Sequence, residues 1–392
     1  MREVVITSAC RTPVGAFGGS LASLSALDLG VVVLREAMRR SSLADEQIDE
    51  VIMGCVLPHG LGQNPARQAC LRAGLPVDVG CITVNKVCGS GLKAVMLAAQ
   101  AVACGDAEVV LAGGMESMSN APYMLMKNRT GYRMGDGKVV DAMICDGLWD
   151  HINDFHMGMS AELCAERYGV SRQDQDQFAY ESYLKALKAQ KAGRFEEQIV
   201  PVEIPQRKGE PKVLDRDEGI MEPDLEKLSR LRPVFKKDGS VTAGNASTLN
   251  DGAAAVAVMS ADKAKELGLT PLVRIGAQGA AGIDPKYVLV APMKSIPKVC
   301  RKQGVDPKDI DLHEINEAFS ASSVAVQREL DLDPAKINIY GGAVSLGHPI
   351  GASGARVLTT LIYAMKDTGA HLGMASLCLG GGEAVSLIVE NL

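Results

Sequence analysis

Two cysteines stand beside glycine-containing turns, where the backbone could approach a substrate closely. Cys88 lies in "NKVCGSGLKA", between a run typical of a strand and a run typical of a helix. A helix N-terminus stabilises a thiolate through its free N–H groups and the positive end of its dipole, so Cys88 could be a nucleophile with a lowered pKa. A buried cysteine at a tight turn explains the same residues equally well.

Cys378 lies in "LCLGGGEA", at the end of an expected strand. Three successive glycines let a backbone approach a ligand closely and could present N–H groups to an oxyanion. The structural alternative is a turn between two strands beside a core cysteine.

A histidine and an asparagine could assist these cysteines. His348 lies in the glycine-rich "GGAVSLGHPIGASGA", where a neutral imidazole could accept a thiol proton. A histidine that only caps the loop is the alternative. Asn316 opens "NEAFSASS" after the expected strand "DLHEI". It could hold a catalytic water, although the N-cap of the following helix is its ordinary structural role.

The elements that must position these residues repeat within the chain. "QIDEVIMGC" resembles "DIDLHEIN" at an offset of 310 − 48 = 262. "GSGLKAVMLAAQ" resembles "GASGARVLTTLI", with Ser90 matching Ser353 (353 − 90 = 263). "LAGGMES" resembles "LGGGEAV", with Glu116 matching Glu383 (383 − 116 = 267). Because three similarities share nearly one offset, we infer a duplicated unit.

Each copy is predicted to alternate strands and helices. The β-branched runs "EVVIT", "CITVN", "EVVLAGG" and "INIYGG" are typical of strands. The segments from Leu92 and from Val357 place apolar residues at helical spacing. This alternation predicts an α/β fold in which two sheets and their helices stack in layers.

Composition divides the chain further. Between the copies, over residues 119–250, Met, Asp, Lys and Pro become frequent and the periodicity breaks up. We therefore predict an inserted loop domain over 119–250. The N-terminal half then covers 1–118 plus 251–270, and the C-terminal half covers 271–392.

Charge and cysteine content disfavour several classes of protein. A net charge of −6 gives no footprint for nucleic acid or an anionic membrane. No stretch approaches the roughly 20 apolar residues of a membrane span. Ten cysteines without a Cys-x-x-Cys pair indicate neither a zinc nor a redox motif, and they favour the reducing cytoplasm.

The four motifs around Cys88, Asn316, His348 and Cys378 stand in the order and spacing of the signature blocks of thiolases. "VTAGNASTLNDGAA" and "DGLWDHINDFHMG" extend the similarity, so the chain resembles a thiolase over its whole length. The resemblance implies a duplicated βαβαβαββ fold. It also implies the reversible condensation of two acetyl-CoA to acetoacetyl-CoA and CoA, or, alternatively, broader 3-ketoacyl-CoA cleavage in β-oxidation.

The resemblance also implies a role for each catalytic residue. Cys88 would become acylated after His348 activates it, and Cys378 would move the α-proton of the second acetyl-CoA. One oxyanion site would use His348 and a water held by Asn316. The other would use backbone N–H groups at Cys88 and Gly380. No metal or redox cofactor is implied, because CoA thioesters are the substrates.

Contacts with CoA are carried over from the matching motifs. They are expected at Leu148, His156, Met157, Phe235, Ala243, Ser247, Leu249, Ala318 and Phe319. The chain departs from the short-chain pattern at Ile220, where an arginine near the CoA phosphate is frequent, and at Val288, where a methionine near the acyl pocket is frequent.

Thiolases are dimers or dimers of dimers, so a homo-oligomer, including a homotetramer, is expected. Two rival classes are disfavoured. Decarboxylating or acyl-carrier condensing enzymes usually pair their cysteine with two histidines, or with histidine and asparagine, instead of a second cysteine such as Cys378. A non-catalytic acyl-CoA binding protein need not keep all four catalytic positions.

Overall fold

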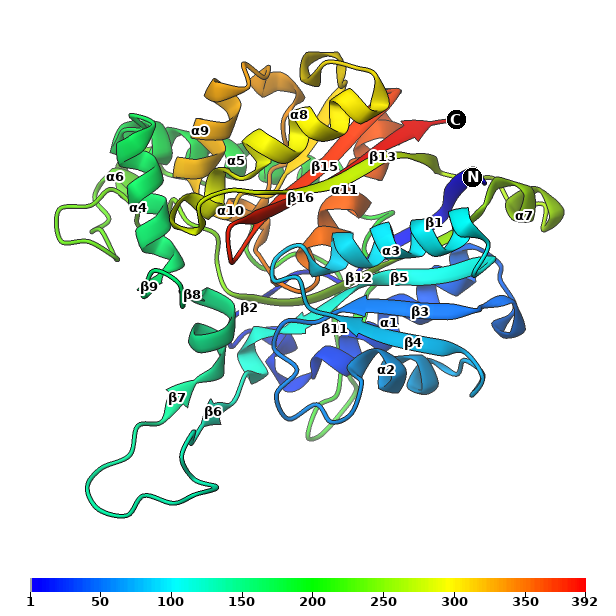
Figure 1. Ribbon diagram of the computed structural model, residues 1–392, viewed down its shortest axis with the longest axis horizontal. Coiled ribbons are helices and arrows are strands. Elements are labelled where there is room, and N and C mark those ends of the chain that lie inside the picture. Colours follow the sequence, from blue (N-terminus) through cyan, green and yellow to red (C-terminus); the bar gives the residue numbers. More distant parts are fainter. Residues whose placement is uncertain (1) are drawn as a thin grey trace.

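A computed structural model describes residues 2–392 of the chain (Figure 1). The first half alternates strands and helices in the predicted order. Its first helix starts with a capping box, in which Ser25 and Asp28 each accept the backbone N–H of the other. The elements of this half are β1 (Val4–Arg11), β2 (Gly15–Ala16), α1 (Ala26–Arg40), β3 (Glu50–Gly54), α2 (Pro65–Ala73), β4 (Gly80–Val84), α3 (Ser90–Cys104), β5 (Val109–Ser117) and β12 (Asn250–Ser260).

The second half repeats this alternation with two strands fewer. Its elements are β13 (Val273–Gly282), α8 (Pro292–Gln303), β14 (Leu312–Ile315), α9 (Ser320–Glu329), α10 (Ala343–Leu346), α11 (Ser353–Thr368), β15 (Leu372–Leu379) and β16 (Glu383–Asn391). The prediction of a strand at "INIYGG" is wrong, because Ile337 makes only a single bridge with His313. Asn338, at φ 45°, bonds the N–H and the C=O of Ile315 through its side chain, where a paired strand would otherwise do so.

One strand order joins the two predicted sheets. It runs β14-β15-β16-β13-β1-β12-β5-β3-β4, and β2 pairs with β12 beside this path. The link between the halves is narrow, because β1 and β13 pair only at Val5↔Arg274 and Ile6↔Val273. The two sheets of the prediction are therefore two halves of one mixed sheet, which bends at this short ladder.

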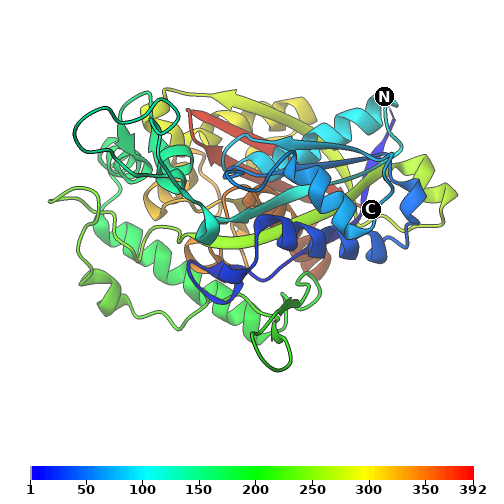
Figure 2. The same ribbon diagram turned by 90° about the horizontal axis from the view of Figure 1, so that it is seen from below.

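Helices cover both faces of each half (Figures 1 and 2). The central core joins α3 and α11 to β1, β5 and β12 on one side and to β15 and β16 on the other. A second core packs α1 and α2 on the outer face of the first half. A third packs α4 (Met157–Arg167), α8 and α9 on the outer face of the second half. Five layers result, with α3 and α11 in the middle.

Two glycines at equivalent positions let the central helices touch. A Cβ on Gly91 would lie 2.8 Å from the Ala355 nitrogen, and a Cβ on Gly354 would lie 2.2 Å from the Leu92 nitrogen. The two glycines are separated by 354 − 91 = 263 residues, the offset predicted from Ser90 and Ser353. Both helices begin at those serines, so the predicted duplication is confirmed at the helices that matter for the site.

The third sequence similarity does not mark equivalent positions. Glu116 lies inside β5, whereas Glu383 opens β16 after the glycine turn that follows β15. The glycines of "LAGGMES" belong to a buried strand. Those of "LGGGEAV" form a turn, with Gly381 and Gly382 at φ 88° and 91°. The matching of Glu116 with Glu383 is therefore wrong, although both strands exist.

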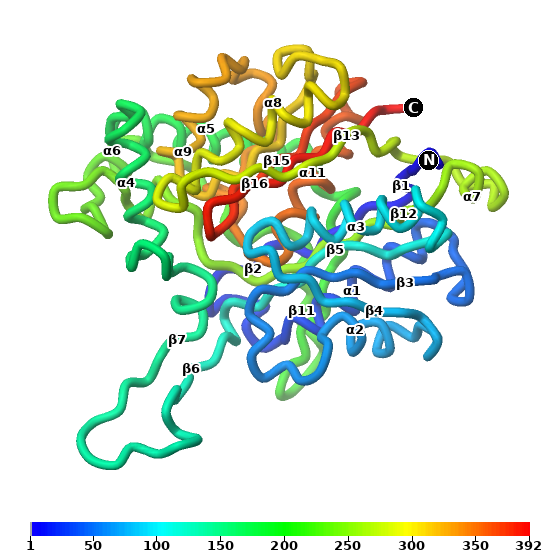
Figure 3. The backbone as a smooth tube through the Cα atoms, in the orientation of Figure 1, coloured from blue at the N-terminus to red at the C-terminus, as the bar shows by residue number. Residues whose placement is uncertain are grey.

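Residues 119–250 carry short elements and two long helices. The first part forms a hairpin, with β6 (Tyr123–Met124) and β7 (Val140–Asp141), that extends away from the body (Figure 3). The helices α4 and α5 then pack beside α9. The remaining elements of this segment are β8 (Trp149–Asp150), β9 (Phe155–His156), α5 (Arg172–Lys191), β10 (Val202–Ile204), β11 (Lys212–Leu214) and α6 (Leu225–Ser229), and α7 (Ala261–Glu266) follows β12.

The segment Val87–Cys104, which contains α3, is long and apolar enough to span a membrane by composition. It has 18 residues with a mean hydropathy of 1.5, and 56% of it is buried inside the protein. The expectation that no stretch approaches this composition is therefore wrong. The central position of α3 accounts for its apolar character, because both of its sides face other layers.

Candidate active site

The five catalytic residues of the prediction come together from different elements. Cys88, His348 and Cys378 line one cavity of about 690 Å³, and Gly380 lies on the same wall. Asn316 lies directly behind this wall, with its Nδ2 atom 3.5 Å from His348 Nε2. The close contact of α3 with α11 explains the convergence, because it joins the turn before α3 to the loop before α11.

A strained turn presents Cys88 to the cavity. The preceding Val87 has φ 46°, in the left-handed region that β-branched residues avoid. Its N–H donates to Asn85 Oδ1 at 3.0 Å, and its carbonyl accepts from Ser90 Oγ at 2.6 Å. Ser90 Oγ also accepts the Lys86 N–H at 2.8 Å. These three bonds hold the turn in a conformation that the backbone alone disfavours.

The thiol of Cys88 is not a resting thiolate. Although the residue is partly open to the cavity, the surrounding protein desolvates its sulfur, and this burial raises the pKa of Cys88 to about 12. The backbone N–H groups of Cys88 and Gly380 favour the charged form, but they offset only part of the burial effect. The expected lowering of the pKa by the helix N-terminus is therefore wrong, and a base must take the proton during attack.

His348 is placed to be that base. Ser353 Oγ lies 2.6 Å from His348 Nδ1 and donates its one hydrogen to the Pro349 carbonyl at 2.9 Å. Because a hydroxyl has only one hydrogen, Ser353 must accept from Nδ1–H, which leaves Nε2 without a proton. Burial, followed by the nearby Arg356 charge, lowers the pKa of His348 to about 3. The imidazole is thus neutral, with its free lone pair on Nε2.

Asn316 is not the N-cap of the helix that follows it. Helix α9 begins at Ser320, and Phe319 occupies the N-cap position. The structural alternative for Asn316 is therefore wrong. Its side chain is buried between His348 Nε2 and the guanidinium of Arg356, whose Nη2 lies 3.4 Å from Asn316 Oδ1.

Cys378 reaches the cavity from the end of β15, opposite Cys88. Burial is the main cause that raises the pKa of Cys378, and the second is the charge of the Cys88 thiolate when it forms. Cys88 and Cys378 thus line the same cavity, as expected for two groups that act on one substrate carbon. The turn that follows Cys378 brings the Gly380 N–H to Cys88.

All nine residues predicted to contact CoA line the same cavity. The ring of His156 stacks on Phe235 with centroids 4.8 Å apart, and Phe235 meets Phe319 edge to face. His156 Nδ1 also accepts the Gly158 N–H at 3.0 Å at the start of α4. Ser247 donates its backbone N–H to the Ala318 carbonyl. These contacts line part of the cavity with flat rings.

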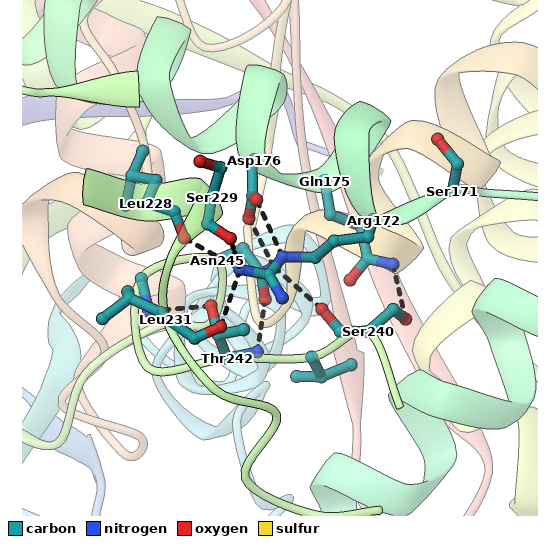
Figure 4. A network of polar contacts seen from close by, with 12 residues as sticks. Ser171, Arg172, Gln175, Asp176, Leu228, Ser229, Leu231, Ser240, Thr242 and Asn245 are labelled. Atoms are coloured by element: carbon teal, nitrogen blue, oxygen red, sulfur yellow. Dashed lines mark hydrogen bonds and ion pairs between the residues drawn. The ribbon is translucent and has the colours of Figure 1, made fainter. Parts of the chain in front are cut away.

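A buried polar network anchors the loop that carries Phe235, Ala243 and Ser247 (Figure 4). Asn245 Nδ2 donates to Asp176 Oδ1 at 2.9 Å and to the Ser240 carbonyl at 3.1 Å. Arg172 pairs with Asp176 at 2.7 Å and also bonds carbonyls of the loop. The loop is thus attached to α5 by side chains, because it has no sheet of its own.

The two departures from the short-chain pattern differ in their relation to the cavity. Val288 is buried and lines the cavity beside Met157. Ile220 lies outside the lining residues, although its neighbours Gly219 and Met221 belong to them. The position that would carry a phosphate-binding arginine therefore presents an apolar side chain next to the cavity rather than inside it.

Sequence reasoning missed three residues around the site. Ser353 fixes the His348 tautomer, and Arg356 contacts Asn316. The buried Glu116 accepts backbone N–H groups from Val56 and Gly351, and so ties the loop after His348 to the first half. Ser353 stood in a quoted motif, and its position five residues after His348 was the available signal.

Comparisons with known proteins agree with this geometry. The family described as "Thiolase, N-terminal domain" matches residues 4–262, and the family described as "Thiolase, C-terminal domain" matches residues 269–391. Together the two domains span nearly the whole chain. The chain belongs to the thiolase family.

Several full-length relatives are named acetyl-CoA acetyltransferase. The chain is 56% identical to the acetyl-CoA acetyltransferase of Cupriavidus necator over 392 residues, with 100% of both chains covered. It is 54% identical to that of Allochromatium vinosum over 391 residues, covering 100% of this chain and 99% of the relative. The crystal structure of the Bacillus anthracis acetyl-CoA acetyltransferase superposes with a TM-score of 0.98 at 45% identity, covering 100% and 99% of the two chains.

Proposed function

We propose that this thiolase is an acetyl-CoA C-acetyltransferase, which condenses two acetyl-CoA to acetoacetyl-CoA and CoA and also runs in reverse. The observation that carries the proposal is the meeting of a neutral His348, Cys88 and Cys378 on one cavity. The names of its full-length relatives support the choice of acetyl-CoA as substrate.

Acylation comes first. Cys88 Sγ attacks the thioester carbonyl while His348 Nε2 takes the thiol proton. The negative oxygen is held by the backbone N–H groups of Cys88 and Gly380, which already lie against the sulfur. The C–S bond to CoA then breaks, and the CoA thiolate takes its proton from Cys378. This step leaves an acetyl group on Cys88, a proton on His348 and a thiolate at Cys378.

Condensation follows on the same groups. The Cys378 thiolate removes an α-proton from the second acetyl-CoA, and the resulting enolate oxygen faces protonated His348 and a water held by the Asn316 amide. The enolate carbon attacks the acetyl carbonyl on Cys88, so a C–C bond forms and the C–S bond to Cys88 breaks. Cys88 takes back the proton from His348, and every group returns to its starting state.

CoA is proposed to enter along the loop that carries Phe235 and Ser247, with its pantetheine arm between His156 and Phe319. The cycle balances without a metal or a redox partner, because each proton is passed between thiols and imidazole. We further propose a cytoplasmic homo-oligomer, a dimer or a dimer of dimers. Size-exclusion chromatography with light scattering tests its size.

A short acyl group is favoured by Met157, which fills the cavity near Cys378. A second candidate, a broader 3-ketoacyl-CoA thiolase of β-oxidation, is favoured by Val288, whose side chain is smaller than the methionine frequent in short-chain thiolases. Each methylene that an apolar pocket rejects is worth about 1–3 kcal/mol, so catalytic efficiency should fall gradually with chain length.

The test is thiolytic kcat/KM for 3-ketoacyl-CoAs of four, six and eight carbons, with Met157→Ala measured alongside. The proposed acetyltransferase prefers four carbons, and Met157→Ala narrows that preference. Equal or rising efficiency toward eight carbons would select the β-oxidation alternative. A wild-type enzyme that releases no CoA on mixing with acetyl-CoA would reject both.

A further inference from the structure

Arg356 is a buried cation with few protein partners. It lies in the first turns of α11 and is 2% exposed. Its Nη2 donates to Asn316 Oδ1 at 3.4 Å, whereas Nε and Nη1 have no hydrogen-bond partner within residues 2–392. Over the same residues it makes no ion pair within 4.0 Å. Because burying a guanidinium is costly, its single contact with Asn316 points to a role beyond packing.

The chemistry of arginine decides the orientation of Asn316. A guanidinium only donates hydrogen bonds, so the side of the amide that faces Arg356 must be the oxygen. The NH₂ group must then face the opposite way, toward His348 Nε2 at 3.5 Å. With a neutral side chain at position 356, the two orientations of the amide would be far closer in free energy.

The hydrogen bonds continue from His348 through Ser353 to the Pro349 carbonyl, which can only accept a hydrogen. The Pro349 carbonyl takes the Ser353 hydrogen, and Ser353 takes that of His348 Nδ1. His348 Nε2 therefore receives a hydrogen from Asn316 and offers none in the resting state. A donor-only cation at one end and a carbonyl at the other impose one direction on all the hydrogen bonds between them.

Two acidic side chains, Glu314 and Glu317, lie near enough to Arg356 to influence its pKa. The carboxyls of Glu314 and Glu317 favour its charged form, although burial lowers its pKa. Glu317 is itself held by Ser182, by Asn338 and by the Val344 N–H. The one close contact of the guanidinium thus goes to Asn316.

We propose that Arg356 is a positioning residue for the condensation half-reaction, fixing the Asn316 amide so that its NH₂ group can hold the water that faces the enolate oxygen beside His348. The inference rests on the proposed function. Acylation uses the other oxyanion site, formed by Cys88 and Gly380, so loss of Arg356 should affect the two half-reactions differently.

The experiment separates those half-reactions. Acylation is measured as the burst of CoA released from acetyl-CoA, and enolate formation as exchange of the acetyl methyl protons of acetyl-CoA in D₂O. Removing a whole oxyanion donor costs about 100-fold or more, so Arg356→Gln should slow exchange at least about tenfold. Its acylation rate should fall by less than its exchange rate, because acylation uses the other oxyanion site and shares only the base His348 with condensation. Arg356→Lys keeps a side chain that only donates hydrogen bonds, so its exchange rate should be close to that of wild type.

A double-mutant cycle tests whether Arg356 acts through Asn316. In an Asn316→Ala background, Arg356→Gln should cause no further loss of exchange. Tyr363→Phe, which removes another buried polar group from α11, is the control and should leave the ratio of the two rates unchanged. If Arg356→Gln fails to fold, the cycle is run with Arg356→Lys, whose smaller loss should likewise vanish.

Two results would overturn the proposal: equal slowing of acylation and exchange by Arg356→Gln, or full additivity with Asn316→Ala. Failure of the proposed function looks different, because the wild-type enzyme would then show neither the CoA burst nor methyl-proton exchange.

Discussion

The turn at Val87 shows how local strain and a reactive group occur together. A β-branched residue in the left-handed region costs on the order of 1–3 kcal/mol, and bonds from Asn85 and Ser90 offset that cost. In return, the turn directs the Cys88 side chain into the cavity, where the backbone N–H groups of Cys88 and Gly380 reach its sulfur.

Ser353 should matter for catalysis through the His348 tautomer. Ser353→Ala removes the acceptor of Nδ1–H, so the proton can move to Nε2 and block the base. We expect kcat/KM for thiolysis to fall by about tenfold or more, and stability to fall by about 1–3 kcal/mol for the buried N–H left unpaired. Steady-state kinetics and chemical denaturation measure the two effects.

The matched control is Ser320→Ala, which removes a buried hydroxyl that has no partner within residues 2–392. It should be close to neutral in both measurements. Unchanged kcat/KM in Ser353→Ala would show that the tautomer is set by some other contact.

At this scale the sequence located the side chains that meet on the cavity but not those that orient them. Cys88, His348 and Cys378 stood in motifs with a recognisable chemistry. Arg356 stood among the apolar residues of an amphipathic pattern, where an arginine usually faces solvent. The lowered pKa expected for Cys88 failed because burial cannot be read from a strand-to-helix boundary.

At the scale of elements, the contact of α3 with α11 is what brings the two halves of the site together. Gly354→Ala would place a Cβ 2.2 Å from the Leu92 nitrogen, a backbone atom that cannot turn aside. The helices must separate, which typically costs about 1–3 kcal/mol for an overpacked core. We expect a lowered Tm and a larger loss of kcat than of substrate binding.

Gly80→Ala in β4 serves as the control for this substitution, because the added Cβ would meet no atom nearer than 3.7 Å. Activity and Tm should both stay near wild type. A Gly354→Ala variant with the same Tm as Gly80→Ala would show that the helices do not depend on this close approach.

The repeat made these elements predictable, and its limits explain the errors. Serines at one offset located the starts of α3 and α11, because both copies need the same helix beneath the same loop. The strand expected at "INIYGG" is absent because the Asn338 side chain satisfies the backbone of Ile315. No periodicity reveals a side chain that replaces a strand.

At the scale of the molecule, the site belongs to neither half alone. Cys88 comes from the first half, His348 and Cys378 come from the second, and residues 119–250 supply aromatic rings of its lining. The halves pair directly only at the short ladder between β1 and β13, so the central helices carry most of their contact. Stability and activity should therefore respond together to substitutions in the central layer.

His313 gives a pH-dependent part of that stability. Burial lowers its pKa to about 4, so it stays neutral in the fold and takes up a proton on unfolding below pH 6.5. Above pH 6.5 the histidine is neutral in both states and costs the fold no stability. As pH falls from 6.5 toward 4, the free energy of unfolding drops by about 1.4 kcal/mol per pH unit, because only the unfolded state takes up the proton. Because His313→Gln lacks this group, the stability advantage of wild type over the variant should shrink by up to about 2 kcal/mol from pH 7 to pH 5.

Urea denaturation of both proteins at pH 8, 7, 6 and 5 measures that difference. It should be constant between pH 8 and 7, where the histidine is neutral in both states. A difference that stays constant down to pH 5 would show that His313 is not held neutral by the fold.

The central claim is that Cys88 carries the acyl group and Cys378 moves the proton. Mass spectrometry of the intact enzyme and its peptides after mixing with acetyl-CoA tests this most directly in wild type, Cys88→Ala and Cys378→Ala. We predict one acetyl group on Cys88 in wild type and in Cys378→Ala, none in Cys88→Ala, and no acetoacetyl-CoA from either variant. An acetyl group found on Cys378, or condensation that survives in Cys378→Ala, would contradict the account.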